Sequence, residues 1–551
     1  MKNKRCSSFP RHKLIFVKLC VLCASVVICI MIPIACYLLQ SNKPELPGTN
    51  TSCTIPVSNH IQLLIDSTAI DPQSGKRIIC QENFDKVLTM IKGARRWIFV
   101  DFFLWNQWQG SIPSDNRKLS KELAEALIQK KQDCPKINIL VLTDPINRIY
   151  GNMEPEFFCR MKDAGIGIVF TDLSLMNDSN LIYSLPVNML VACFGRILWI
   201  NKLLDKSFLP NIMDIDGKQM SLRQVGRLLF FKANHRKVII VDGYPQGGST
   251  SGRDVPTSAG DWQMLVTSFN PADGSSANSN CGLFASGDIA LAALDTELSC
   301  VEWSAINPCN VLGDAKRLLS LFREAQRKEG TKAQRSKGTE VGKEGSKIEW
   351  LTEGAILNRI LDMLKSAGPG DEVRMAIFYL SERRVIQAIK SAAKKGANIR
   401  IIMDANRDAF GHIKIGIPNR PVAAELLQVE NITIRWADTH GEQFHSKALC
   451  IVNKNKQKYQ FMCGSANWTR RNLTGKQTPT RGCPYNLEAN LFVNNAPEIT
   501  SKFIEYFDQV WYNKDGLKHT VDYLEIGEKG WQLFWKTIIY RLQEATGACT
   551  F

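Results

Sequence analysis

The sequence predicts an α/β protein made of two similar lobes related by a pseudo-twofold axis. Each lobe is expected to hold a mostly parallel or mixed sheet flanked by helices, after an N-terminal transmembrane helix. The chain has 551 residues, of which 44% are hydrophobic and 22% charged, and this is typical of a folded body of several domains. Strand-like runs alternate with helical patterns of about 10–15 residues, which favours βαβ units, and the whole series occurs twice.

The N-terminal segment predicts a membrane anchor. Residues 1–18 form a basic tail, and residues 19–39 carry no formal charge. An apolar run of this length crosses roughly 30 Å of hydrocarbon as a helix. Basic residues before the run predict a cytoplasmic N-terminus, with the rest of the chain on the non-cytoplasmic side. A cleaved signal peptide is the alternative.

The first copy of the series spans residues 61–324, after a linker at 40–60. Strand-like runs lie at 61–65, 97–104 and 137–143, with helical patterns at 84–94 and 119–130 between them. This copy carries an insertion at about 181–230, whose residues 181–200 are largely apolar. The insertion is either a buried helical element or an amphipathic patch that rests on a membrane.

The second copy spans residues 348–551, after a polar, basic linker at 325–347. Strand-like runs at 348–351, 373–378 and 399–403 alternate with helical patterns at 356–366 and 384–395. The third strand of each copy ends at an aspartate, Asp144 in the first copy and Asp404 in the second. The repeated order predicts that the two lobes have the same fold.

A His-x-Lys sequence follows at the same place in each copy. The first copy has His235 and Lys237, and the second has His445 and Lys447. Alternate residues of a strand share a face, so each histidine points the same way as its lysine. One such pair means little, but two pairs in the same context, each leading to a Gly/Ser-rich turn, indicate one shared catalytic site.

These residues resemble the phospholipase D superfamily, whose mark is a duplicated HxKxxxxD sequence followed by a Gly-Ser-x-Asn or Gly-Gly-x-Asn turn. The first motif, from Asn234 to Gly243, is most similar to the cardiolipin synthase and bacterial phospholipase D branch. The resemblance covers about residues 61–511. It implies that the two motifs meet at the pseudo-dyad and that the reaction passes through a phosphohistidine, with no metal or other cofactor.

The resemblance also implies roles for the motif residues. His235 is expected to be the nucleophile and His445 the acid/base, although pseudo-symmetry leaves the reverse assignment open. Lys237 and Lys447 would hold the non-bridging phosphate oxygens as point charges. Asp242 completes the first motif.

The turns after the motifs supply further candidates. Ser465 and Asn467 are expected to bind phosphate oxygens in the second copy. The first copy lacks an asparagine in its Gly247–Thr250 turn, so Thr250 or Ser251 would take that place.

A carboxylate is expected to orient one of the histidines. Glu488 matches such a group in related enzymes, and its first-copy equivalent is Asp261 or Gln263. Trp531 near the C-terminus is expected to serve packing rather than base stacking.

The charge and the motifs together predict the substrate class. The formal net charge of +16 favours anionic partners, either phospholipid headgroups or nucleic acid. The first hypothesis is a membrane-anchored phosphodiesterase or phosphatidyltransferase acting on glycerophospholipids, and the alternative is a single-span nuclease. A silent binding protein is disfavoured because both His-Lys pairs are intact. No obligate protein partner is implied, since both motifs lie in one chain.

Overall fold

The computed structural model of the chain describes residues 34, 43–57, 60–109, 116–179, 184, 198–211, 218–243, 262–336, 345–409, 412–473, 483–527 and 530–546. The predicted transmembrane segment at 19–39, apart from Ile34, lies outside these residues, as does most of the apolar stretch at 181–200. Among the described residues, no helix combines the length and the apolar character needed to cross a bilayer. The anchor therefore stays a prediction without structural support.

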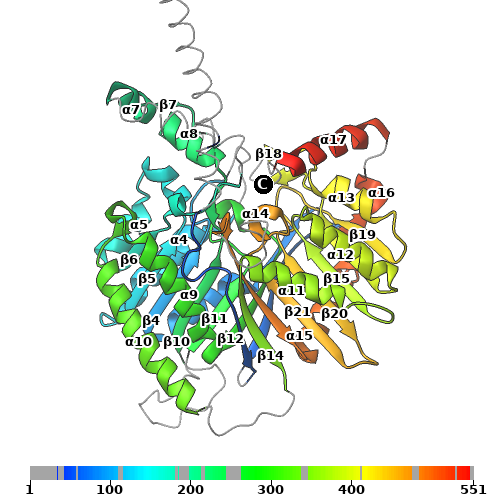
Figure 1. Cartoon of the computed structure of the whole chain (residues 1–551), viewed down its shortest axis with the longest axis horizontal. Coiled ribbons are helices and arrows are strands. Elements are labelled where there is room, and N and C mark those ends of the chain that lie inside the picture. Colours follow the sequence, from blue (N-terminus) through cyan, green and yellow to red (C-terminus); the bar gives the residue numbers. More distant parts are fainter. Residues whose placement is uncertain are drawn as a thin grey trace, which may run out of the picture.

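Two nine-stranded sheets form the framework of the molecule (Figure 1). In sheet order, the first contains β13 (Val311–Leu312), β6 (Gly167–Phe170), β5 (Asn138–Thr143), β4 (Ala94–Phe102), β10 (Lys237–Gly243), β11 (Trp262–Thr267), β12 (Asn280–Ser286), β2 (Ile61–Ile70) and β3 (Arg77–Gln81). The second contains β1 (Ser52–Pro56), β14 (Lys347–Thr352), β23 (Ala489–Asn494), β21 (Lys458–Gly464), β20 (Lys447–Asn453), β15 (Glu372–Ile377), β16 (Asn398–Asp404), β19 (Ile432–Ala437) and β24 (Thr520–Asp522).

The two sheets repeat one topology. The order β6-β5-β4-β10-β11-β12-β2 in the first sheet matches β19-β16-β15-β20-β21-β23-β14 in the second. In each sheet three strands are parallel, β4-β5-β6 and β15-β16-β19, and the pairs beyond them are antiparallel. The sheets are therefore mixed, which was one of the two forms that the sequence predicted.

Some helices cover the outer face of each sheet, and others pack between the two sheets in the core that the lobes share (Figure 1). The helices of the first lobe are α3 (Glu82–Gly93), α4 (Leu119–Asp133), α5 (Glu156–Asp163), α7 (Leu198–Asp205), α8 (Leu222–Leu229), α9 (Asp288–Ser304) and α10 (Ala315–Ser336). Those of the second are α11 (Gly354–Lys365), α12 (Arg383–Lys394), α13 (Asn419–Leu426), α14 (Arg470–Leu473), α15 (Pro497–Tyr512), α16 (Tyr523–Ile526) and α17 (Gly530–Thr546).

Apolar periodicity explains why these segments are helical. In α12, Val385, Ile386, Ile389, Ala392 and Ala393 are buried, at the spacing that puts them on one face of a helix. The carboxylate of Glu382 begins this helix by accepting a hydrogen bond from the backbone N–H of Arg384. The buried face of α12 packs on the parallel strands of the second sheet.

One hydrophobic core joins the two lobes. It contains Val238 and Met264 from the first sheet and Trp350 and Leu491 from the second, all with at most 1% of their surface exposed. The predicted linker at 40–60 contributes to this union, because its strand β1 pairs antiparallel with β14 of the second sheet. The N-terminal segment of the described chain therefore crosses from the second lobe to the first.

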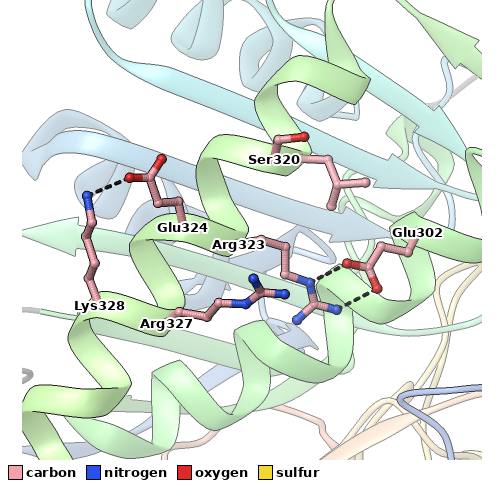
Figure 2. Close-up of a pocket in the computed structure, with 7 residues that line it drawn as sticks. Glu302, Ser320, Arg323, Glu324, Arg327 and Lys328 are labelled. Carbon is pink, nitrogen blue, oxygen red and sulfur yellow. Dashed lines mark hydrogen bonds and ion pairs between the residues drawn. The ribbon is translucent and has the colours of Figure 1, made fainter.

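The predicted linker at 325–347 is helical at its start. Helix α10 continues to Ser336 and packs beside α9, where Arg323 Nε lies 2.6 Å from Glu302 Oε1 (Figure 2). Residues 337–344 of this linker lie outside the described residues. Exposed ion pairs such as Lys328–Glu324 on the same helix contribute little stability.

Candidate active site

Each His-Lys motif begins the central strand of its sheet and contacts the other lobe. Short β9 (Ala233–Asn234) precedes the first motif and pairs with β22 (Asn486–Leu487) of the second lobe. The backbone N–H of His235 donates to Leu487 O at 2.9 Å, and that of His445 donates to Ser279 O at 2.8 Å. These reciprocal bonds bring both histidines to the interface between the lobes, where they line the same cavity.

Each histidine is held at Nδ1 by a side chain of the opposite lobe. His235 Nδ1 lies 2.8 Å from Glu488 Oε1, and His445 Nδ1 lies 3.2 Å from Asn280 Oδ1. The Asn280 amide nitrogen donates to Asp66 Oδ2 at 3.0 Å, so the amide oxygen faces the histidine. An acceptor at each Nδ1 places the proton there, and Nε2 of both rings then carries a free lone pair.

Asn280 is therefore the first-copy equivalent of Glu488, in place of the predicted Asp261 or Gln263. Asp261 lies outside the described residues, and Gln263 bonds Gly243 O instead. The local sequences Asn278-Ser-Asn280 and Asn486-Leu-Glu488 match, and each leading asparagine accepts a backbone N–H just ahead of the opposite motif. This Asn-x-Asn/Glu pattern occurs in both copies of the sequence and could have identified Asn280 as the equivalent of Glu488.

Ser465 positions Glu488 and does not line the cavity. Its hydroxyl donates to the Glu488 carboxylate and accepts the N–H of Ala489 at 2.9 Å. The same arrangement occurs in the first lobe, where Ser268 Oγ donates to Asn280 Oδ1 at 3.1 Å. Ser465 therefore supports the carboxylate of Glu488, and its phosphate contact stays a prediction.

The first lobe does have a turn asparagine. Asn270 stands two residues after Ser268, as Asn467 stands two residues after Ser465, and both line the cavity. The predicted substitute Thr250 lies outside the described residues. The sequence comparison overlooked Asn270 because residues 244–261, between β10 and β11, carry a Gly-Gly-Ser-Thr run that resembles the expected turn. The role of Thr250 stays a prediction.

Asp242 lies at the opposite end of β10 from the histidine. Its carboxylate accepts the backbone N–H groups of Arg96 and Trp97 at 2.8 and 2.7 Å, and it pairs with Arg96 Nε at 3.0 Å. It therefore ties β10 to the start of β4 and does not reach the cavity. In the second lobe, where Val452 replaces the aspartate, the neighbouring Asn453 bonds Asp371 at 2.6 Å.

The two lysines lie beneath the histidines and are buried. Lys237 Nζ donates to His235 O, and Lys447 Nζ donates to His445 O, both at 2.6 Å. Each ammonium also lies over an aromatic ring at the end of a parallel strand, Phe103 at 5.1 Å and Phe378 at 4.9 Å. The aromatic rings in turn contact the two histidine rings, so each pair is held rigidly.

Burial and mutual repulsion shift the protonation of this cluster. Desolvation lowers the pKa of Lys237 to about 7, and desolvation together with Lys237 lowers the pKa of Lys447 well below its usual value. Burial and the two ammonium groups lower the pKa of both histidines. Burial raises the pKa of Glu488 to about 7, against the attraction of Lys237. A cluster that is short of negative charge in this way favours the binding of an anion such as a phosphodiester.

The cavity above the histidines has a volume of about 370 Å³ and a mainly apolar wall. Its apolar lining includes Phe103, Leu104, Ile146, Tyr150, Leu228, Phe231 and Phe378. Three cationic side chains that the sequence comparison missed, Lys232, Lys414 and Arg471, also line it. They lie outside the motifs and come from three separate parts of the chain, so no sequence spacing identified them.

A paired His-Lys site between two topologically equal lobes defines a class of protein, and comparison with known proteins agrees. Residues 360–511 match the family model described as cardiolipin synthase, PLD-like domain. The mouse (Mus musculus) mitochondrial cardiolipin hydrolase is 24% identical over 164 residues, which cover 30% of this chain and 62% of that relative. The resemblance to the phospholipase D superfamily that the motifs predicted is thus confirmed over residues 360–511.

Two solved structures are among those that align with this chain. Phosphatidylserine synthase of Haemophilus influenzae Rd KW20 aligns with a TM-score of 0.49 and 12% identity, over 94% of this chain and 98% of that chain. Nuc of Salmonella typhimurium, a phospholipase D family member, aligns with a TM-score of 0.23 and 18% identity, over 31% of this chain and 97% of that one.

Proposed function

We propose that this chain is a phosphodiesterase or phosphatidyltransferase that acts on glycerophospholipids through a phosphohistidine. The observation that carries the proposal is the placement of both histidines, each with a free Nε2, at the base of one largely apolar cavity. An apolar wall suits acyl or glycerol groups, while the cationic side chains suit the phosphate. The N-terminal anchor, with the catalytic body on the non-cytoplasmic side, is part of this proposal.

The difference between the two histidine partners supports His235 as the nucleophile. Attack by His235 Nε2 on phosphorus forms a P–N bond, breaks the bond to the leaving alcohol and puts positive charge on the imidazole. The carboxylate of Glu488 at Nδ1 stabilises that charge, whereas the neutral amide of Asn280 behind His445 offers less. On these electrostatic grounds we propose His235, and not His445, as the nucleophile.

His445 is then the acid and the base of the two half-reactions. In the first, its protonated Nε2 gives a proton to the leaving oxygen; the bound phosphate anion offsets the lysine charges that otherwise lower the pKa of His445. In the second, Nε2 takes a proton from water or an alcohol, whose oxygen attacks phosphorus and releases His235. Lys237 and Lys447 balance the charge of the phosphoryl oxygens throughout.

A nuclease is the second candidate, and the formal net charge of +16 favours it. The two are separated by incubating the full chain, in detergent micelles and without added metal, with phosphatidylglycerol or phosphatidylcholine vesicles and with a single-stranded oligonucleotide. Headgroup release or transfer that is lost in both His235→Ala and His445→Ala supports the lipid reaction. Cleavage of the oligonucleotide with unchanged vesicles would overturn it.

A further inference from the structure

The C-terminal helix α17 exposes a stripe of large apolar side chains. Trp531, Phe534, Trp535, Ile539 and Leu542 have exposed fractions of 69, 52, 45, 38 and 61%. Trp531, Trp535, Ile539 and Leu542 follow one another at three- and four-residue steps on one face of the helix, and Phe534 lies three residues after Trp531 at the edge of that face. These five residues are named the α17 stripe. Trp531, which the sequence predicted to serve packing, is largely exposed, and its ring contacts Phe534 and Trp535 within the stripe.

The opposite face of α17 is fixed firmly to the second lobe. Tyr540 is buried, and Arg383 of α12 joins Glu544 of α17 and Glu425 of α13, with both distances 2.8 Å. Arg541 of α17 also pairs with Glu425 at 3.0 Å. The helix therefore holds its apolar stripe outward as a rigid feature, whereas a frayed terminus would collapse such residues onto the body.

The stripe lies at the same end of the molecule as the elements around the cavity. In Figure 1, α17 is on one side of the upper end, α7, β7 (Ser207–Leu209) and α8 are on the other, and α14 and β18 (His412–Ile413) lie between them. Leu228 of α8, Arg471 of α14 and Lys414 beside β18 all line the cavity. Ile415, next to Lys414, is 57% exposed, so apolar surface continues toward the rim.

The side opposite α17 carries a second apolar group. Leu203 of α7, Phe208 of β7 and Leu222 of α8 are 49, 45 and 40% exposed. Apolar side chains thus project on both sides of the elements that line the cavity. Scattered single apolar residues need no explanation, but a gathering of aromatic and aliphatic groups around a site entrance marks an interaction surface.

The start of the described chain indicates what covers this surface. Lys43 Nζ donates to the carbonyl oxygens of Ser174 and Met176, at 2.6 and 2.7 Å, and Met176 O also accepts from the cavity residue Lys232. The predicted anchor ends at residue 39, and a fully extended chain covers at most about 3.6 Å per residue. Residue 39 is therefore within about 15 Å of Lys43, and the anchor proposed above would bring a bilayer beside the cavity.

We infer that the α17 stripe and Leu203, Phe208 and Leu222 dock on the surface of a phospholipid bilayer, so that the cavity opens toward the headgroups. Helix α17 combines tryptophan and phenylalanine with the basic residues Lys536 and Arg541, and this composition is typical of helices that lie in the membrane interface. This inference rests on the proposed function, because it supplies the route by which a bilayer lipid enters the cavity.

Lipids with brominated acyl chains test the contact directly. The full chain is reconstituted in phosphatidylcholine/phosphatidylglycerol vesicles, and quenching of tryptophan fluorescence by the brominated lipid is measured. Trp531→Phe/Trp535→Phe should lose a large part of the quenching, whereas Trp511→Phe, at a 5% exposed position, should retain it. Equal quenching in the double variant and the wild type would overturn the inference. These conservative changes keep the fold, and the readout needs no activity.

The second measurement compares two forms of the lipid. Phe534→Ser/Leu542→Ser should lower turnover of vesicle lipid by about tenfold, with turnover of a short-chain lipid below its micellar concentration unchanged. Gln532→Ser, which changes an exposed polar residue of the same helix, is the control. Equal loss on both substrates would contradict docking, as would a drop from dimer to monomer mass, which would show a second copy on the stripe. If the wild type turns over neither lipid, the proposed function fails, while the quenching result still decides the docking.

Discussion

At the scale of single residues, the two halves of the site differ in the group that holds each histidine, a carboxylate in one and an amide in the other, and the proposed roles rest on this difference. Glu488 and Asn280 occupy equivalent places, each held by a serine, and each bonds Nδ1 of the opposite lobe's histidine. A carboxylate stabilises an imidazole that carries a phosphoryl group, while an amide only orients one. The asymmetry of roles within a symmetric frame follows from this difference.

Replacing Glu488 by glutamine tests that asymmetry. The amide keeps an acceptor for His235 Nδ1 but removes the charge, so we expect kcat/KM to fall by about 100-fold or more. Steady-state turnover of the phosphodiester substrate provides the measurement. Glu488→Asp, which keeps the charge, should recover part of the loss; equal activity of the wild type and Glu488→Gln would refute the role of the carboxylate.

The pH dependence of kcat/KM should be bell-shaped. Glu488 must be ionised, and with its pKa raised to about 7 the rate falls as pH decreases through this value. Lys237 must be protonated to bind phosphate, and with its pKa lowered to about 7 in the empty site the rate falls as pH increases beyond it. The optimum is therefore narrow and near neutrality, and Glu488→Gln should remove the acidic limb. A flat profile between pH 5 and 9 would be inconsistent with these groups.

The turn asparagines can be compared by alanine substitution. Because Asn270 and Asn467 both line the cavity at equivalent positions, we expect each alanine variant to raise KM by about tenfold through loss of one phosphate contact. Thr250→Ala, at the position that the sequence comparison favoured, should stay within about twofold of the wild type. A larger increase in KM for Thr250→Ala than for Asn270→Ala would instead support Thr250 as the phosphate-binding residue of the first copy.

At the scale of elements, the strands that support the histidines are coupled by buried polar side chains. Asn83 of α3 donates to Asp66 of β2, and Asp66 accepts from Asn280, which bonds His445. Gly282 of β12 is close to this relay, because a Cβ there would lie 2.2 Å from Asn83 Oδ1. The bare glycine backbone therefore leaves the space that the asparagine fills.

Gly282→Ala is expected to disturb both folding and the site. The added methyl group must displace Asn83 or the strand, at a cost of about 1–3 kcal/mol in the free energy of unfolding. Misplacement of Asn280 should also lower kcat, with His445 less well oriented. Denaturant unfolding and steady-state kinetics measure the two effects, and Gly93→Ala, where a Cβ meets nothing within 4 Å, is the control.

At the scale of the whole molecule, one buried arginine joins the lobes behind the motif. Arg236, between His235 and Lys237, pairs with Glu297 of α9 at 3.3 Å and with Glu353 of the second lobe at 2.7 Å. Glu353 also accepts the backbone N–H of Glu488 at 2.9 Å. The arginine thus connects the two lobes to the carboxylate that holds His235.

Removing this charge should destabilise the assembled pair of lobes. Arg236→Met leaves two buried carboxylates without their partner, and we expect the free energy of unfolding to fall by about 3–5 kcal/mol. The urea midpoint should decrease accordingly, while Arg96→Met, whose half-exposed side chain pairs with Asp242, should change it much less. Similar midpoints for the two variants would show that the buried network contributes little.

The sequence by itself determined the duplication, the class of fold and the four motif residues His235, Lys237, His445 and Lys447. These features are readable because strand and helix periodicity and the alternation of side chains along a strand act over a few residues. Glu488 was found through the family resemblance, but its equivalent Asn280 and the turn residue Asn270 were not, since a similar run at residues 247–250 stood in the expected place. Only the tertiary structure decided which lobe supports which histidine, because the hydrogen bonds that do so join residues 165 and 253 positions apart. It also decided that Lys232, Lys414 and Arg471 meet at one cavity and that the α17 stripe faces outward, since solvent exposure is a property of the packed molecule rather than of any segment.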